Sequence, residues 1–179
     1  MSTKTTEQER NWVEEIGKRA FDSIAEMVAA LECDYNRLEE LRDDRDGYDD
    51  PNDHVGNDAD NSAEAWALDN PDEAEELAGM VKDAGDCKDQ DEARERIEED
   101  ALSVEVGCWW TPGSEAEPTE YRILLTTGGP AVRIVGDLGQ HNEPHRARLE
   151  VQDWFKPWTE YHCDEEILLA YARCFFFGE

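Results

Sequence analysis

The sequence contains no hydrophobic run of the roughly 18 residues that a membrane-spanning helix needs, and its first residues, MSTKTTEQERNW, contain no apolar signal segment. Positive charge is also scarce, because 17 Lys and Arg residues face 46 Asp and Glu residues and leave a net charge of −29. Gripping nucleic-acid phosphates requires a basic patch, and anionic membranes attract basic segments. We therefore expect a soluble, cytoplasmic protein that binds neither nucleic acid nor a membrane directly.

Cysteine pairs and nucleotide-binding motifs are missing as well. The five cysteines are odd in number, widely spaced and without a CxxC pair, which predicts reduced thiols rather than a disulfide framework. Gly128 and Gly129 occur outside any GxGxxG or P-loop pattern, so we expect a turn and no nucleotide cofactor. The 39% of hydrophobic residues is nevertheless enough for a folded protein.

Acidic residues are distributed unevenly along the chain. Residues 1–100 contain 33 acidic and 11 basic residues, whereas residues 101–179 contain 13 and 6. Near residue 100 the apolar pattern also changes from a helical period to strand-like alternation. We predict an α+β fold, in which acidic N-terminal helices (1–100) pack with a C-terminal antiparallel sheet of about four strands and a closing helix (101–179).

Apolar residues recur at helical spacing from 6 to 43. Val13, Ala20 and Met27 fall on one heptad position and Ile24 on the other, so we predict one long amphipathic helix. Its apolar stripe either packs within the domain or forms the seam of a homodimer. The stretch 43–61 is rich in turn formers and almost free of apolar residues, which predicts a mobile loop. The register of its acids and glycines does not fit an EF-hand calcium site.

Capping residues and alternation predict the remaining elements. Asn70 before Pro71 indicates a helix that stops at Gly85, and Asp89 with Glu92 three residues later indicates the start of the next helix. One helical turn is expected within 62–69. Alternating residues predict strands at 103–111, 121–127, 131–137 and 145–154, a hairpin turn at 128–130, and a last helix at 164–176.

The histidines supply an alternative, catalytic interpretation. His141, His145, His162 and Cys163 are residue types that bind zinc, and neighbouring strands could bring them together. Only the His-x-Glu half of the zinc-deaminase pattern is present, however, and no GxSxG motif supplies a nucleophile. A metal-dependent enzyme with a His/Cys site therefore remains the alternative, while we expect no catalytic residue, no metal and no cofactor.

The acidic tract is the strongest functional signal. Residues 39–100 contain 25 acidic and six basic residues. Carboxylates spaced along helices can approach the linear charge density of B-form DNA, and such a surface is attracted to the basic groove of a nucleic-acid-binding protein. This predicts a nucleic-acid mimic that acts by occupying such a groove. The expected contact residues are Asp43, Asp44, Asp46, Asp49, Asp50, Glu73, Glu76, Glu95, Glu98 and Glu99.

Two further interpretations compete with mimicry. Acidity can be a halophilic or solubilising adaptation, although that adaptation would spread acid evenly. The C-terminal half is also rich in aromatic residues, and adjacent aromatics such as Trp109 and Trp110 point to opposite faces of a strand. We expect the N-terminal helices to cover the second face of the sheet; the alternative is that this face presents aromatics to a partner protein.

Several short motifs of the C-terminal part resemble an uncharacterised family of proteins encoded by bacteriophages and integrative mobile elements. These motifs are Leu102–Val106, Thr126–Arg133, Gln152–Trp154 with Pro157–Tyr161, and the ending Phe176–Glu179. The resemblance implies a setting in the bacterial host cytosol, where small acidic proteins often act as anti-CRISPR or anti-restriction inhibitors. It implies no catalytic residues and names no target.

Overall fold

The fold class is α+β, as predicted. The computed structural model describes residues 7–48, 59–109, 117–154 and 156–178, and these form six α-helices, one short 3-10 helix and a five-stranded antiparallel sheet. The chain divides into two compact units, which we name the sheet unit (Met1–Val28 and Arg94–Glu179) and the helical unit (Ala29–Ala93). The helices α1 (Glu7–Glu32) and α5 (Gln90–Asp100) each run from one unit into the other.

The sheet is a meander in which each strand pairs with the next one in sequence. Its strands are β1 (Ser103–Trp109), β2 (Glu117–Thr126), β3 (Ala131–Asp137), β4 (Arg148–Gln152) and β5 (Thr159–Tyr161), in that order across the sheet. The sequence predicted four of them. The fifth has only three residues, too few to show an alternating pattern.

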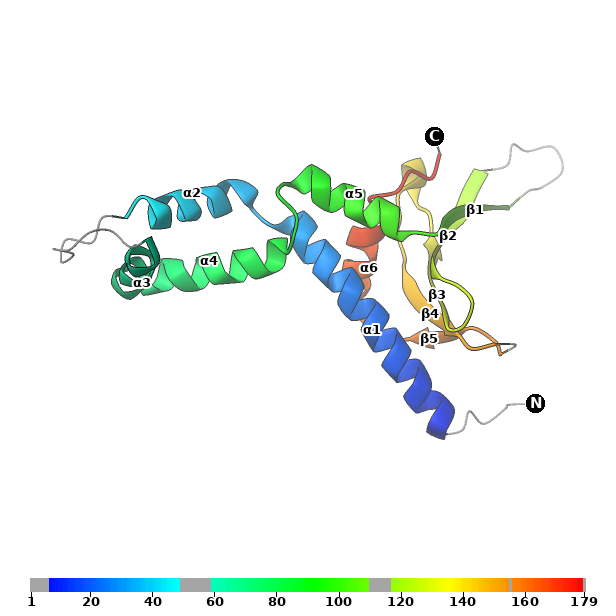
Figure 1. The fold of residues 1–179 in the computed structure, drawn as a ribbon. Helices are drawn as coiled ribbons and strands as arrows, with labels where there is room; N and C mark the ends of the chain where they lie inside the picture. Colours follow the sequence, from blue (N-terminus) through cyan, green and yellow to red (C-terminus); the bar gives the residue numbers. More distant parts are fainter. Residues whose placement is uncertain (1–6, 49–58, 110–116, 155, 179) are drawn as a thin grey trace. The chain divides into compact units, whose positions relative to one another are not determined.

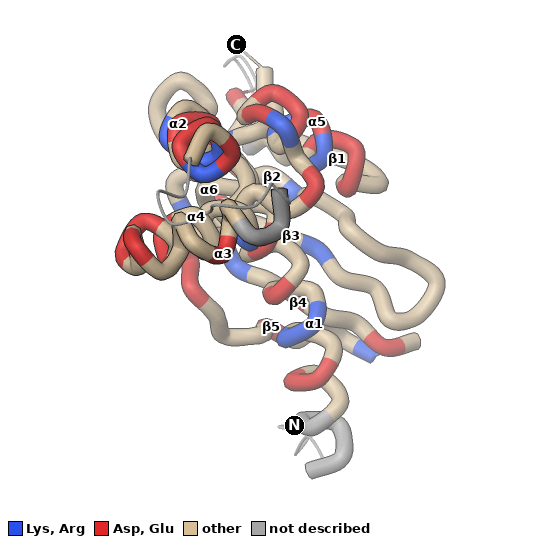
Figure 2. Tube along the Cα trace, turned by 60° about the vertical axis from the view of Figure 1, so that its left-hand side comes forward, with Lys and Arg blue, Asp and Glu red and all other residues tan. Residues whose placement is uncertain are grey.

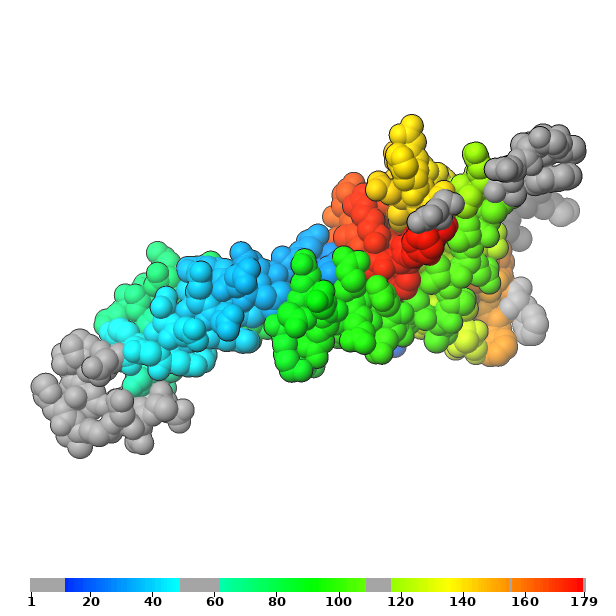
Figure 3. All heavy atoms as spheres, turned by 90° about the horizontal axis from the view of Figure 1, so that it is seen from above, coloured from blue at the N-terminus to red at the C-terminus, as the bar shows by residue number. Residues whose placement is uncertain are grey.

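Helices cover one face of the sheet. Figure 1 shows α1 and α6 (Glu165–Ala172) on the same side of the strands. This face supplies the core of the unit, with Tyr121, Ile123, Ile134 and Leu149 fully buried. The segment that contains the 3-10 helix η1 (Gln140–Asn142) stands out from the surface, in yellow in Figure 3.

The second face of the sheet is charged. Arg133 pairs with Glu150 at 2.7 Å, and Arg148 pairs with the same carboxylate at 3.0 Å. The guanidinium of Arg133 also lies 3.9 Å from the centre of the Trp158 ring. Within the sheet unit, no described helix covers this face, so the expectation that N-terminal helices shield it is wrong for the residues of this unit.

The helical unit packs three helices around its own apolar cluster. These are α2 (Tyr35–Asp46), α3 (Ala59–Asp69) and α4 (Pro71–Ala84). Their shared core consists of Leu38, Leu41, Trp66, Leu77 and Ala84, each at most 6% exposed. The unit therefore has a hydrophobic core that does not draw on the sheet.

The single helix predicted over 6–43 is wrong, because the chain breaks it at Cys33 and Asp34. The Asp34 carboxylate accepts a hydrogen bond of 3.1 Å from the Arg37 amide and so caps a new helix, α2. No proline or glycine marks this break, which is why the apolar pattern alone missed it.

The boundaries of the acidic loop also differ from the prediction. α2 continues to Asp46, so residues 43–46 are helical, and α3 is a full helix of 11 residues rather than one turn. Residues 49–58 of the predicted loop lie outside the described residues. The predicted starts of α4 and α5 are confirmed, with Pro71 at the first position of α4 and Asp89 accepting a 2.8 Å hydrogen bond from the Glu92 amide.

Candidate functional site

The helical unit concentrates the negative charge of the chain. Its 65 residues contain 23 acidic and five basic residues, and the stretch 46–81 contains twelve acidic residues without a single Lys or Arg. Figure 2 shows the acidic positions in red along α2, α3 and α4. This excess of negative charge is the first requirement for a surface that binds a polycation.

Helix α2 exposes carboxylates on the side away from its core. Leu38 and Leu41 are buried, and helical spacing places Glu39, Glu40 and Asp43 on the opposite, exposed side. Arg37 and Arg45 flank the buried side, and each side chain is 36% exposed, whereas Arg42 is exposed. Carboxylates therefore outnumber bases on the exposed surface of α2.

The half-buried arginines are engaged within the unit. Arg37 donates two hydrogen bonds to the Glu76 carboxylate, from Nε at 3.1 Å and from Nη2 at 2.9 Å, and also lies 3.5 Å from Glu40. These bonds tie α2 to α4 and hold the pKa of Glu76 below its ordinary value. Arg45 pairs in the same way with Asp46 at 2.7 Å. Glu76 and Asp46 are thus partly neutralised.

Helix α4 also exposes carboxylates, together with one base, Lys82. Ala74, Leu77 and Ala84 face the core, whereas Glu75 and Asp83 lie on the far side of the helix and are exposed. Among the described residues, neither of these two carboxylates has an ion-pair partner. Asp69 at the end of α3 accepts a hydrogen bond from the Tyr48 hydroxyl instead.

The predicted contact residues divide between the two units. Those on α2 and α4 are Asp43, Asp44, Asp46, Glu73 and Glu76, all exposed. Those on α5, also exposed, belong to the sheet unit: Glu95, Glu98 and Glu99. Asp49 and Asp50 lie outside the described residues.

Sequence analysis missed four acidic residues on the outward faces of α2 and α4. Their helical phase relative to the buried leucines would have identified them, whereas a count of acidic residues gives no such distinction. They are Glu39, Glu40, Asp72 and Glu75. Together with Asp43, we call them the acidic face, a name for the exposed carboxylates on the outward sides of two helices that pack on a shared core.

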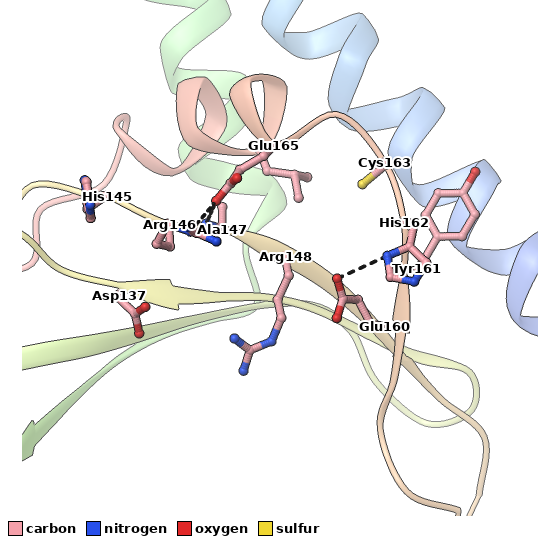
Figure 4. A pocket seen from close by; sticks show the side chains of 11 residues that line it. Asp137, His145, Arg146, Ala147, Arg148, Glu160, Tyr161, His162, Cys163 and Glu165 are labelled. Carbon is pink, nitrogen blue, oxygen red and sulfur yellow. Dashed lines mark hydrogen bonds and ion pairs between the residues drawn. The ribbon is translucent and has the colours of Figure 1, made fainter.

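Three of the four residues of the alternative interpretation line a cleft of about 600 Å³ in the sheet unit. These are His145, His162 and Cys163. Figure 4 shows His145 at one end of this cleft and His162 and Cys163 at the other, with Arg146 and Arg148 between them. His141 is not among the lining residues. In the described part of the chain, no three His, Cys, Asp or Glu side chains come close enough to hold a metal ion.

The cleft also lacks an activated nucleophile among its described residues. Burial, together with the nearby carboxylates of Asp164 and Glu160, raises the pKa of the Cys163 thiol to about 11. The thiol is therefore protonated at neutral pH and unreactive. His162 lies with its Nδ1 3.3 Å from Glu160, and no hydrogen bond joins its imidazole to the Cys163 thiol among the described residues. Arg146 and Glu165 form a separate ion pair at 3.1 Å.

The aromatic alternative finds limited support in exposure. Trp154 is 61% exposed and Phe176 is 77% exposed, while Trp158 is half-buried under Arg133. Trp110 lies outside the described residues. The described aromatics therefore do not form one continuous aromatic face on the sheet.

Comparison with known proteins yields no relative. No protein-family model and no curated protein matches the sequence, and no solved structure matches the fold. Among the described residues, no helix is both long and apolar enough to span a membrane.

Proposed function

We propose that the protein is a non-catalytic inhibitor whose acidic face binds the basic, nucleic-acid-binding surface of another protein. The target belongs to a host defence complex, and the protein acts as an inhibitor of the anti-CRISPR or anti-restriction type, which is where the resemblance of residues 101–179 to mobile-element proteins points. Binding takes place without chemistry, by competition with DNA or RNA for the same groove.

The observation that carries this proposal is the concentration of negative charge in the helical unit. Its 23 acidic residues outnumber five basic residues, and two of these, Arg37 and Arg45, are held in ion pairs within the unit. A halophilic adaptation would spread acid evenly over both units. Unpaired outward carboxylates remain available for a cationic partner and attract it over distances of about 10 Å at moderate salt.

The energetics of exposed charges shape the expected behaviour. One exposed ion pair contributes about 0.2–1 kcal/mol, so no single carboxylate decides binding. Several pairs formed together, with release of small ions from the partner, give affinity that falls steeply with salt.

A capture experiment with matched variants tests the proposal. The full-length protein is immobilised and exposed to a nuclease-treated bacterial lysate, and bound proteins are eluted either with NaCl steps or with duplex DNA. The test variant combines Glu39→Gln, Asp43→Asn and Glu75→Gln, none of which removes an ion pair found among the described residues. The control variant combines Glu14→Gln, Glu26→Gln and Glu143→Gln, which removes the same charge from the sheet unit.

We expect nucleic-acid-binding proteins to be retained, to be released by duplex DNA, and to be lost from the test variant but kept by the control. Retention that survives about 0.5 M NaCl would contradict the proposal, because screening at that concentration removes long-range attraction. Equal loss from both variants would contradict it too, since only total charge would then matter.

A further inference from the structure

Strand β1 is an open edge of the sheet. It pairs only with β2, so every second backbone N–H and C=O along it points away from the sheet without a strand partner among the described residues. The side chains that β1 directs to the helix-covered face are also accessible, with Val104 38% and Val106 41% exposed. Figure 1 shows this strand at the margin of the sheet.

The apolar residues of this edge continue the core. Val104 lies opposite Ile123 and Val106 lies opposite Tyr121 on β2, and both β2 residues are fully buried. The Phe177 ring packs against Tyr121 with its centre 4.8 Å away. One more strand beside β1 would bury the two valines and extend this core by one row.

The opposite face of the same edge is acidic. Glu105 alternates with the two valines, and Glu120 of β2 reaches over Gly107, where its Oε2 lies 3.6 Å from the position that a Cβ would occupy. Neither carboxylate forms an ion pair with the described residues. Arg122 lies opposite Glu105 on the inner side, which leaves the outer side of Glu105 to an incoming strand.

From this two-faced edge we infer that β1 binds an extended segment of a partner protein in which apolar and basic residues alternate. The segment adds a sixth strand beside Ser103–Gly107, ahead of the irregularity between Gly107 and Cys108. Its apolar side chains cover Val104 and Val106, and its Lys or Arg side chains meet Glu105 and Glu120. Main-chain hydrogen bonds supply affinity, and the alternation supplies register.

Charge distinguishes this occupant from a second copy of the chain. Two copies with a net charge of −29 repel each other. Antiparallel pairing of two β1 edges would also bring the Glu105 side chains of the two copies close together. A basic segment removes both penalties. The inference is independent of the acidic face, because β1 and that face belong to different units.

Synthetic peptides test the inference on the full-length protein. The first probe is a blocked peptide of about nine residues in which valine and lysine alternate, matching the length of an ordinary strand. The second has the same composition with all lysines at one end, and the third is the alternating peptide N-methylated at every second residue. Backbone amide hydrogen exchange, read by NMR, reports where each peptide binds.

We expect the alternating peptide to slow exchange at residues 103–107 by about tenfold or more when bound, and the other two peptides to leave these amides unchanged. The variant Glu105→Gln with Glu120→Gln should weaken binding several-fold, and Val104→Thr with Val106→Thr by about tenfold, since each change removes a buried methyl contact. The variant Glu14→Gln with Glu26→Gln is the charge control and should bind as the unmodified protein does.

Two outcomes would overturn the inference. Equal protection by the block-lysine peptide would mean that net charge alone attracts the probe. A dimer in sedimentation, with residues 103–107 already protected in the absence of peptide, would mean that a second copy occupies the edge. The glutamine variant alters exposed side chains only and therefore keeps the test valid if the threonine variant folds poorly.

Discussion

Gly17 marks the point where α1 meets β5. A Cβ at this position would lie 2.3 Å from the Cγ of Tyr161, so the side chain of Tyr161 occupies the space that a larger residue would need. Gly79 of α4 is the opposite case, because no atom beyond its chain neighbours and the adjacent backbone of its own helix lies within 4 Å of its Cβ position. The same residue type is therefore required at one helical site and dispensable at another.

Alanine substitutions at these two glycines should act in opposite directions. Gly17→Ala should destabilise the protein, because overpacking costs about 1–3 kcal/mol and outweighs the roughly 1 kcal/mol that alanine contributes to a helix. Gly79→Ala should stabilise it by up to about 1 kcal/mol. Urea denaturation followed by circular dichroism measures both. An increase in stability for Gly17→Ala would show that Tyr161 does not pack tightly on α1.

The thiol of Cys163 should react slowly. Its pKa of about 11 is two units above the ordinary value of 9.0, so at about pH 8 the folded protein holds about a hundredfold less thiolate than the denatured chain. Alkylation by iodoacetamide, measured by peptide mass spectrometry, should stay slow in the folded protein until the pH approaches 11 and should speed up in urea. Rapid labelling at neutral pH would instead favour the Cys–His interpretation.

At the level of elements, aspartates set where the acidic helices begin. Asp34 caps α2 and Asp89 caps α5, each through a hydrogen bond from a backbone amide three residues later. These two aspartates are structural, although they look like the many other exposed acids in the sequence. Acidic residues that cap helices therefore occur in the same part of the sequence as the acidic residues proposed to bind a partner.

Removing either cap should cost stability without affecting binding of the acidic face. We expect Asp34→Ala and Asp89→Ala each to lower the free energy of unfolding by about 0.5–2 kcal/mol. Asp86→Ala serves as the control, because Asp86 is exposed and makes no hydrogen bond or ion pair with the described residues. A control that loses as much stability as the cap variants would refute the capping role.

The elements also show what sequence patterns can and cannot reveal. Strand β3 was predicted with its observed bounds, because it directly follows the hairpin turn at 128–130. The break before α2 escaped prediction, since Asp34 differs from its acidic neighbours only in one hydrogen bond. Helical phase could have indicated the acidic face, but not the engagement of Glu76, because its pairing with Arg37 joins residues 39 positions apart. Tertiary contacts of this kind leave no local signal.

For the whole molecule, the dominant physical quantity is charge. A net charge of −29 and a pI near 4.2 mean that the folded chain repels itself at neutral pH. The ion pairs found among the described residues connect only a minority of the acids. The free energy of unfolding should therefore depend on ionic strength through the repulsion among all the carboxylates, and not through any single ion pair.

Salt should stabilise the protein. Raising NaCl from about 0.01 M to about 0.1 M shortens the Debye length from about 30 Å to about 10 Å and weakens the repulsion among carboxylates. The melting temperature should rise by about 2–4 °C for each kcal/mol of repulsion removed. Calorimetry measures this rise, and the variant with Glu39→Gln, Asp43→Asn and Glu75→Gln should show a shallower one. A melting temperature that is constant or falls with salt would refute the self-repulsion argument.

The sheet unit is built from two segments that are far apart in the sequence, and this delays its folding during synthesis on the ribosome. Residues 1–28 emerge before the helical unit, yet the strands that complete their own unit are encoded after residue 94. The helical unit is continuous in sequence and can acquire its core as soon as it is exposed. The amphipathic start of α1 must therefore wait, with its apolar side chains uncovered, until the strands β1 to β5 have been translated. Its dense flanking carboxylates would then serve to keep the nascent chain from aggregating during that delay.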